Sequence, residues 1–145
     1  MEYRRVCKTE DIFRVLVCYN KEFVRPISKR VGSLEDYSKK LCENAYVYLL
    51  IEDGKEIGMI AYYANDCVGR KAYLTSVAMV KNARGKGYGK LALEYMEKHC
   101  KSMGYKYVAL ECDICNNVAM SFYESLGYSN VVKRLEESVI LEKEI

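Results

Sequence analysis

The chain has 145 residues, half of them hydrophobic, and its 23 basic and 20 acidic side chains give a net charge of +3. That length suits a single domain, residues 1–145, and the near balance of charge gives no electrostatic case for general nucleic-acid binding. No apolar run approaches the ~20 residues that cross a bilayer, and the first residues lack the apolar core of a signal peptide. We therefore expect a cytoplasmic protein without nucleic-acid or membrane partners.

The first part of the chain predicts a strand and two helices. Residues 2–7 fit a strand, and apolar side chains at spacings of three and four then predict an amphipathic helix capped by Thr9. Its inner face would be Ile12, Val15, Leu16 and Tyr19. Residues 23–32 break the periodicity around the only proline and predict a loop. Ser33 would cap a second helix with Leu34, Tyr37 and Leu41 facing inward.

The rest of the chain predicts strands first and then alternating helices and strands. Turn signals separate three strands, over residues 45–51, 56–63 and 73–80. After them the expected order is helix 88–103, strand 107–111, a helix starting at 116–117, and strands 128–133 and 138–141. We expect an α/β fold with one mixed, mostly antiparallel twisted sheet of about six or seven strands and helices on both faces. Strands separated by a helix should be parallel neighbours.

The stretch between strand 73–80 and the following helix is rich in glycine. Gly85, Gly87 and Gly89 let the backbone approach a ligand closely, and the N–H groups of the helix's first turn point outward with a partial positive charge. The flanking cations are Arg84, Lys86 and Lys90. These features predict an anion-binding turn for a phosphate-bearing ligand.

Two other phosphate-binding motifs match the glycine turn less well, and a third interpretation predicts no ligand there. A dinucleotide fingerprint needs G-x-G-x-x-G early in a βαβ unit, and a nucleoside-triphosphate loop needs Ser or Thr where Leu91 follows Lys90. A plain helix start, whose glycines only permit a tight turn, remains an alternative.

Seven cysteines are many for this length, but their odd number and irregular spacing do not match a secreted disulfide framework. Cys112 and Cys115 form a C-x-x-C, and a zinc site there would need His99 and Cys100 to complete it. The sequence has neither a second C-x-x-C nor an H-x-x-x-H partner. We therefore expect reduced cysteines that act as small hydrophobic residues, and no metal.

Two motifs resemble a known family. The pattern Arg84-x-x-Gly87-x-Gly89 resembles the acetyl-CoA pyrophosphate loop, [Q/R]-x-x-G-x-[G/A], of the GNAT superfamily of N-acetyltransferases. Residues 110–128 are similar to its other signature, a strand that ends in an acidic residue before N-x-x-A-x-x-[FL]-Y-x-x-x-G-[FY]. Both motifs occur once and in the expected order. The resemblance implies the acyl-CoA N-acyltransferase fold, with acetyl-CoA as cosubstrate.

The resemblance also implies where acetyl-CoA would bind. Strands 73–80 and 107–111 would splay apart so that the thioester lies between them, and the pantetheine arm would pair with the first strand's backbone. The cofactor-binding residues would be Val77, Ala78 and Met79 on the strand, Arg84, Gly85, Lys86, Gly87, Tyr88, Gly89 and Lys90 in the glycine turn, and Asn116, Ala119 and Tyr123 on the later helix.

The implied reaction is attack of a neutral amine on the thioester carbonyl, promoted mainly by proximity. A backbone N–H near Met79 could stabilise the oxyanion, and Tyr123 would give a proton to the departing thiolate, whose basicity a phenol matches. Packing beside Phe122 is the alternative role for Tyr123. Glu111 is the predicted catalytic base, with Asp113 on the same strand face as the alternative and a water as a possible relay, since residues 70–80 lack the acid that many members carry there. His99 lies too far along its helix.

The acceptor is less defined. In this fold the loop 23–32 and residues 133–138 would line the amine site, and Arg25, Lys29 and Arg30 suggest an acceptor with a carboxylate or phosphate, unless they are a solvated charge run. We expect a small-molecule amine or amino sugar as substrate, and a monomer or homodimer. The alternative acceptor is a protein N-terminus. The alternative functions of the whole protein are a non-catalytic acyl-CoA-binding module and a nucleotide or RNA binder. Leu110-Glu111 favours the protein N-terminus, although 135–145 lack that branch's aromatic tail.

Overall fold

The computed structural model describes residues 1–23 and 25–145; Val24, part of the predicted loop 23–32, lies outside the described residues. The helices are α1 (Thr9–Tyr19), α2 (Ile27–Val31), α3 (Leu34–Asn44), α4 (Tyr88–Ser102) and α5 (Asn117–Ser125), with short 3₁₀ turns η1 (Asn20–Glu22) and η2 (Lys81–Ala83). The strands are β1 (Glu2–Arg5), β2 (Ala45–Glu52), β3 (Lys55–Asp66), β4 (Lys71–Met79), β5 (Tyr107–Asp113), β6 (Asn130–Arg134) and β7 (Ser138–Glu144).

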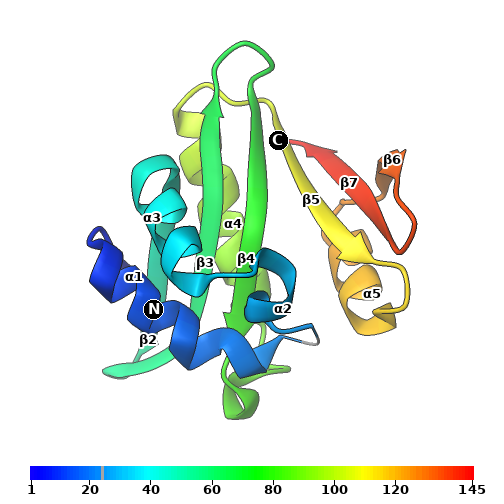
Figure 1. The fold of residues 1–145 in the computed structure, drawn as a ribbon. Coiled ribbons are helices and arrows are strands. Elements are labelled where there is room, and N and C mark those ends of the chain that lie inside the picture. The colour runs from blue at the N-terminus through cyan, green and yellow to red at the C-terminus, as the bar shows by residue number, and fades with distance from the viewer. Residues whose placement is uncertain (24) are drawn as a thin grey trace.

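The described strands form one seven-stranded sheet in the order β1-β2-β3-β4-β5-β7-β6. Neighbours are antiparallel except β4 and β5, which are parallel because α4 connects them. Figure 1 shows α1, α2 and α3 in front of the sheet and α4 behind it, while β5, β6 and β7 stand to one side with α5. The predicted mixed, mostly antiparallel sheet with helices on both faces is confirmed.

Each face of the sheet has its own hydrophobic core. On the α1 and α3 face, Leu16 and Leu41 pack with Met59 of β3. On the opposite face, Met96 of α4 packs with side chains such as Leu110 of β5, and the apolar side of α5 adds to the same cluster. Alternate residues of the strands between them enter one core or the other, as period-two geometry requires.

The local signals in the first part of the chain predicted most of what forms there. All four side chains of the predicted inner face of α1 are buried. Thr9, however, is the first residue of α1 and not its cap, because Lys8 occupies that position without a side-chain hydrogen bond. The Ser33 hydroxyl accepts a hydrogen bond from the Asp36 N–H at 3.2 Å and so caps α3 as predicted. Within the described part of the predicted loop, residues 27–31 form the short helix α2 after Pro26, a start that proline favours.

The expectation that helix-separated strands are parallel neighbours is wrong at two places. β1 and β2 flank α1 to α3 but pair antiparallel, with Glu2 opposite Ile51. β5 and β6 flank α5 but do not pair, since β7 lies between them and pairs with both. The C-terminal strand therefore enters the interior of the sheet, which sequence order alone does not indicate.

The parallel pair β4 and β5 opens part-way along its length. The two strands are in register from Lys71 and Tyr107 only as far as Leu74 and Leu110. Beyond that point β4 continues along β3 and β5 continues along β7, so the two edges separate (Figure 1). A β-bulge at Thr75 marks the point, because Leu74 and Ser76 pair with consecutive residues of β3. The predicted splay of these two strands is thus present.

No helix within residues 1–23 and 25–145 is both long and apolar enough to cross a bilayer.

Candidate active site

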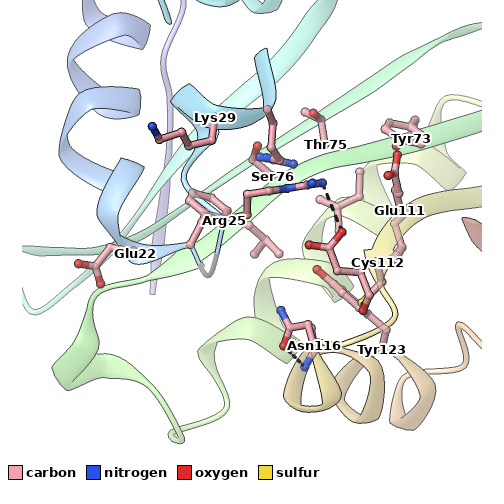
Figure 2. A pocket seen from close by; sticks show the side chains of 17 residues that line it. Glu22, Arg25, Lys29, Tyr73, Thr75, Ser76, Glu111, Cys112, Asn116 and Tyr123 are labelled. Atoms are coloured by element: carbon pink, nitrogen blue, oxygen red, sulfur yellow. Dashed lines mark hydrogen bonds and ion pairs between the residues drawn. The ribbon is translucent and has the colours of Figure 1, made fainter. Parts of the chain in front are cut away.

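A cavity of about 490 Å³ occupies the opening between β4 and β5. Its lining comes from four parts of the chain: the segment around α2, the middle of β4, the end of β5 and the start of α5. Figure 2 shows this arrangement, with α2 on one side of the opening and α5 on the other. The lining residues are Glu22, Phe23, Arg25, Lys29, Arg30, Tyr73, Leu74, Thr75, Ser76, Val77, Leu110, Glu111, Cys112, Asp113, Asn116, Ala119 and Tyr123.

The side of the cavity next to α2 is charged. Glu111 and Asp113 alternate along β5 with Leu110 and Cys112, which belong to the α4-side core, so both carboxylates lie on the α2 face. Asp113 forms an ion pair with Arg25 at 3.3 Å, which joins the segment before α2 to the end of β5 across the cavity. The predicted alternative base is therefore already neutralised by a cation.

Glu111 is positioned by a residue of β7. The buried Ser138 hydroxyl donates a hydrogen bond to Glu111 Oε2 at 2.7 Å. Figure 2 shows the Glu111 carboxylate beside the Tyr73 ring of β4. Burial raises the pKa of Tyr73, and the Glu111 charge raises it further, while Arg30 acts in the opposite direction. Glu111 thus holds its place in the cavity through β7 and faces β4.

The side next to α5 is uncharged. Tyr123 packs its ring against Phe122 and Tyr128, with centroids 5.3 Å and 6.3 Å away, and reaches from α5 toward the cavity (Figure 2). Burial raises the pKa of Tyr123 above the usual value of about 10, and Cys112 adds to this effect against an opposing effect of Arg30. The phenol is therefore fully protonated at neutral pH and able to act as a proton donor.

Asn116 and Ala119 lie together where α5 begins. The Asn116 side-chain oxygen accepts a hydrogen bond from the Ala119 N–H at 3.1 Å, so Asn116 is the N-cap of this helix. Both residues line the cavity. The cap fixes the side chain beside the opening, and its amide nitrogen is not part of the capping bond.

The predicted backbone-binding residues of β4 lie along the open edge. β5 pairs with β4 only up to Leu74, so within the described residues no strand pairs with this edge from Val77 to Met79. Ala78 is buried in the α1 and α3 core, and the Met79 sulfur packs so tightly over Gly58 that a Cβ there would lie 2.4 Å from it. These side chains serve the fold, and what β4 offers a ligand is its main chain.

The glycine turn is open at the N-terminus of α4. Gly85 and Gly87 have φ of +74° and +86°, and a Cβ on either would meet no atom within 4 Å. Gly87 is the N-cap of α4 and provides no side-chain cap, so Tyr88 begins the helix without one. Lys86 and Lys90 are exposed on either side of this end. Neither lysine lines the cavity between the strands, and the turn lies beyond it.

Two residues of the turn have structural partners that the sequence did not predict. The Arg84 guanidinium donates to the Met79 carbonyl at 3.2 Å and pairs with Glu22 at 3.0 Å. The backbone N–H of Arg84 donates to the Lys81 carbonyl at 3.4 Å. Its charge is therefore already paired. A Cβ on Gly89 would lie 3.1 Å from the Phe122 ring, so this glycine lets α4 and α5 pack closely.

His99 and the cysteines lie away from this chemistry. His99 Nδ1 is 2.7 Å from the Tyr62 hydroxyl within a group of aromatic rings, and burial, together with Arg5, lowers the pKa of His99. Cys112 is buried at the cavity wall and Cys115 is exposed. Among residues 1–23 and 25–145 there is no group of three or more His, Cys, Asp or Glu side chains suited to a metal ion.

Two residues that line the cavity, Tyr73 and Ser76, were missed at the sequence level. They carry no motif, and their place in the site depends on how β4 aligns with β3 and β5. The predicted segment 133–138 does not line the cavity, but its Ser138 reaches the site through the hydrogen bond to Glu111. Ser76 is 3% exposed and its hydroxyl has no hydrogen-bond partner among the described residues. Period-two alternation within β4 and within β5 could have placed Tyr73 and Glu111 on the same face of the sheet. It could not have predicted that the two side chains lie next to each other.

Comparison with known proteins agrees with this geometry. Residues 10–128 match the acetyltransferase (GNAT) family. A glucosamine 6-phosphate N-acetyltransferase from Arabidopsis thaliana is 40% identical over 62 residues, 43% of this chain and 40% of that protein, so the match spans less than half of that relative. N-alpha-acetyltransferase 30 of Schizosaccharomyces pombe is 34% identical over 126 residues, 78% of this chain and 82% of that protein. The PaiA N-acetyltransferase of Thermoplasma acidophilum, solved in complex with coenzyme A, has the same fold, with a TM-score of 0.77 at 19% identity over 100% of both chains.

Proposed function

The chain belongs to the acetyltransferase (GNAT) family, whose members use acetyl-CoA as cosubstrate, and we propose that it acetylates the primary amine of a small molecule or amino sugar. The amine would attack acetyl-CoA directly while both are bound. The observation that carries this proposal is the opening between β4 and β5, which has Tyr123 on one side and Glu111 on the other.

The glycine turn suits the diphosphate of acetyl-CoA. Its two positive-φ glycines leave open space, and the uncapped start of α4 directs main-chain N–H groups outward. Lys86 and Lys90 add positive charge at the same end. These N–H groups, from Gly85 to Lys90, would hold the diphosphate, and the open edge of β4 from Val77 to Met79 would pair with the pantetheine arm. Arg84 would support the turn through its pair with Glu22.

The α5 side would receive the thiol end of the molecule. Bound acetyl-CoA supplies an acyl group on a thiol leaving group. Asn116 and Ala119 lie where α5 meets the opening, and Tyr123 reaches into it. Because burial keeps Tyr123 protonated, it would give its proton to the departing sulfur.

The α2 side would receive the amine. Glu111 would accept the proton that the amine loses, directly or through a water, and Ser138 holds the carboxylate in place. We favour Glu111 over Asp113, since Asp113 is paired with Arg25. In total a C–N bond forms and a C–S bond breaks, the amine proton goes to Glu111, the Tyr123 proton goes to sulfur, and solvent returns a proton from Glu111 to Tyr123.

The test is release of free thiol from acetyl-CoA in the presence of a panel of amines. We expect release with at least one small amine or amino sugar, and mass spectrometry should find an acetamide as the second product. A protein that binds acetyl-CoA by calorimetry and releases no thiol with any amine or peptide would contradict this function.

The second candidate acceptor is a protein N-terminus. It is favoured by the similarity to N-alpha-acetyltransferase 30, which extends over most of both chains. Short peptides with free N-termini, run in the same assay, separate the two candidates: peptide turnover that exceeds that of every small amine would favour the second.

A further inference from the structure

Some of the charged side chains that line the cavity form no ion pair within the described residues. Six lining side chains are charged, three acidic and three basic: Glu22, Glu111, Asp113, Arg25, Lys29 and Arg30. Two of the acids are already paired with arginines, Glu22 with Arg84 outside the cavity and Asp113 with Arg25 across it. The ion pairs of the described residues include neither Glu111 nor Lys29 and Arg30. One carboxylate and two cations are thus left for a ligand.

Arg30 is the unpaired cation that overlooks the opening. Its guanidinium carbon lies 5.5 Å from the centre of the Phe23 ring, which orients the side chain at the cavity wall. Although burial raises the pKa of both Tyr73 on β4 and Tyr123 on α5, the Arg30 charge opposes that rise at each of them. Arg30 lines the cavity together with Tyr73 and Tyr123, so its charge faces the same opening as both phenols. Lys29, by contrast, points away from Glu111 and Tyr123 in Figure 2.

A second, independent feature on the same face also points to a polar ligand. Ser76 lines the cavity, is 3% exposed, and keeps its hydroxyl oxygen buried without a hydrogen-bond partner among the described residues. A buried hydroxyl without a partner costs free energy unless a ligand or water satisfies it. Thr75 beside it is already bonded to the Tyr37 hydroxyl at 2.6 Å, so the neighbouring polar group of β4 has its partner within the protein.

We propose that the acceptor is a small primary amine that also carries an anionic group, a phosphate or carboxylate, which Arg30 and Arg25 bind on the α2 side while Glu111 faces the amine. This rests on the proposed acetyltransferase function and names its substrate class. Arginine suits the role because its planar guanidinium binds either anion with two parallel hydrogen bonds. Arg25 would keep its pair with Asp113, which uses its Nη2 atom, and would turn its other guanidinium donors to the anion of the acceptor. Ser76 would donate its unpaired hydroxyl to the same ligand.

Matched pairs of amines that differ by one anionic group test this. Phosphoethanolamine is compared with ethanolamine, and β-alanine with β-alaninamide, in the thiol-release assay. We expect kcat/KM to be at least about tenfold higher for the anionic member of one pair, and that pair identifies phosphate or carboxylate as the group. Equal or better turnover of the neutral member in both pairs would overturn the inference.

Arg30→Gln is the diagnostic variant. It should lower kcat/KM for the preferred anionic amine at least about tenfold, through KM, and leave its neutral counterpart within about twofold. Arg14→Gln is the matched control, because Arg14 is an exposed arginine of α1 paired with Asp11 and lies outside the cavity lining. An equal loss for both members of a pair, or weaker coenzyme A binding in Arg30→Gln, would mean that Arg30 serves the fold or the cofactor instead.

A binding measurement keeps the inference separate from the proposed function. Phosphoethanolamine and β-alanine are titrated calorimetrically into the protein saturated with coenzyme A. Binding that Arg30→Gln abolishes, with no thiol release from any amine, would count against the acetyltransferase proposal alone. Turnover of neutral amines or peptides without any gain from an anion would count against the anionic acceptor alone. No binding of either anionic amine would also overturn it.

Discussion

The two sides of the opening between β4 and β5 are built in different ways. The α5 side is uncharged and is formed by one continuous stretch, with Asn116, Ala119 and Tyr123 following directly after β5. The α2 side is charged and combines α2, β4, β5 and a buried serine of β7. The difference indicates a division of labour. The α5 side comes from one stretch of chain and offers one phenol, which suits a cofactor that the whole family shares. The α2 side combines side chains from distant segments, which suits an acceptor particular to this protein.

The glycine turn extends the α5 side, and blocking it should remove the cofactor and with it all turnover. Gly87→Glu would place an anion where we expect the diphosphate, and we expect acetyl-CoA affinity to fall at least about 100-fold by calorimetry. The backbone must also hold φ of +86°, which costs roughly 1–2 kcal/mol for a residue with a side chain.

Gly104→Glu is the control for that strain. Gly104 follows the other end of α4, has φ of +90°, and also has open space around it. Both variants should lose similar stability, but only Gly87→Glu should lose acetyl-CoA. Undiminished affinity in Gly87→Glu would remove the glycine turn from the cofactor site.

Tyr123→Phe tests the chemistry of the α5 side. Loss of a proton donor should lower kcat about 10²- to 10⁴-fold, while the dissociation constant of acetyl-CoA changes less than about threefold. Tyr128→Phe is the matched control, because its hydroxyl donates to Glu97 at 2.7 Å in the core and should affect melting temperature more than turnover. If Tyr123→Phe turned over at the normal rate, Tyr123 would be a packing residue.

Glu111→Gln tests the α2 side in the same way. The amide keeps an oxygen for the Ser138 hydrogen bond but cannot accept a proton from the amine, so we expect kcat to fall about 10²-fold. Glu144→Gln removes a carboxylate from the far end of the β5 and β7 pair, opposite Tyr107, and should leave kcat unchanged. Equal rates for the Glu111 variant and the wild type would transfer the role of base to Asp113 or to water.

The smallest effect concerns two tyrosines next to the α2 side. The Tyr37 hydroxyl is bonded to Thr75 at 2.6 Å, whereas the Tyr63 hydroxyl is buried without a partner among the described residues. Tyr37→Phe should lower the free energy of unfolding by about 1 kcal/mol, and Tyr63→Phe should leave it unchanged or raise it slightly. Denaturant titration at neutral pH measures both. A larger loss from Tyr63→Phe would mean that its hydroxyl has a partner, such as a buried water.

Alkaline pH should separate the same two variants further. Burial, with smaller contributions from Tyr37 and Tyr73, raises the pKa of Tyr63 to about 12, against about 10 in the unfolded chain. The folded protein holds the Tyr63 proton more tightly than the unfolded chain does, so the wild type keeps its full stability below a pH of about 10. It loses stability as the pH rises from about 10 toward about 12. Over that range Tyr63→Phe should lose less stability than the wild type.

Sequence patterns predicted the site where it follows the chain and missed it where it crosses strands. The glycine turn, the helix start at residues 116–117 and the strand that carries Glu111 are local, and their spacing was enough to predict them, although β5 runs two residues further than predicted, to Asp113. Thr9 was assigned as a cap that it is not, since the polar residues Lys8, Thr9, Glu10 and Asp11 follow one another there and residue type does not choose among them. The partners of Arg84 and Gly89 depend on which helix and which turn lie opposite, and no local pattern specifies that.

By itself, the sequence determined most of the helices and strands, the glycine turn before α4 and the order of the motifs, because each depends on residues close together in the chain. Only the tertiary structure decided that β7 lies between β5 and β6, that Ser138 holds Glu111, and that Asp113 is paired with Arg25. The reason is physical. The strand order and the side-chain ion pairs depend on burial and charge between segments that are far apart in the chain. Contacts between such segments contribute to the free energy only when the whole domain has folded.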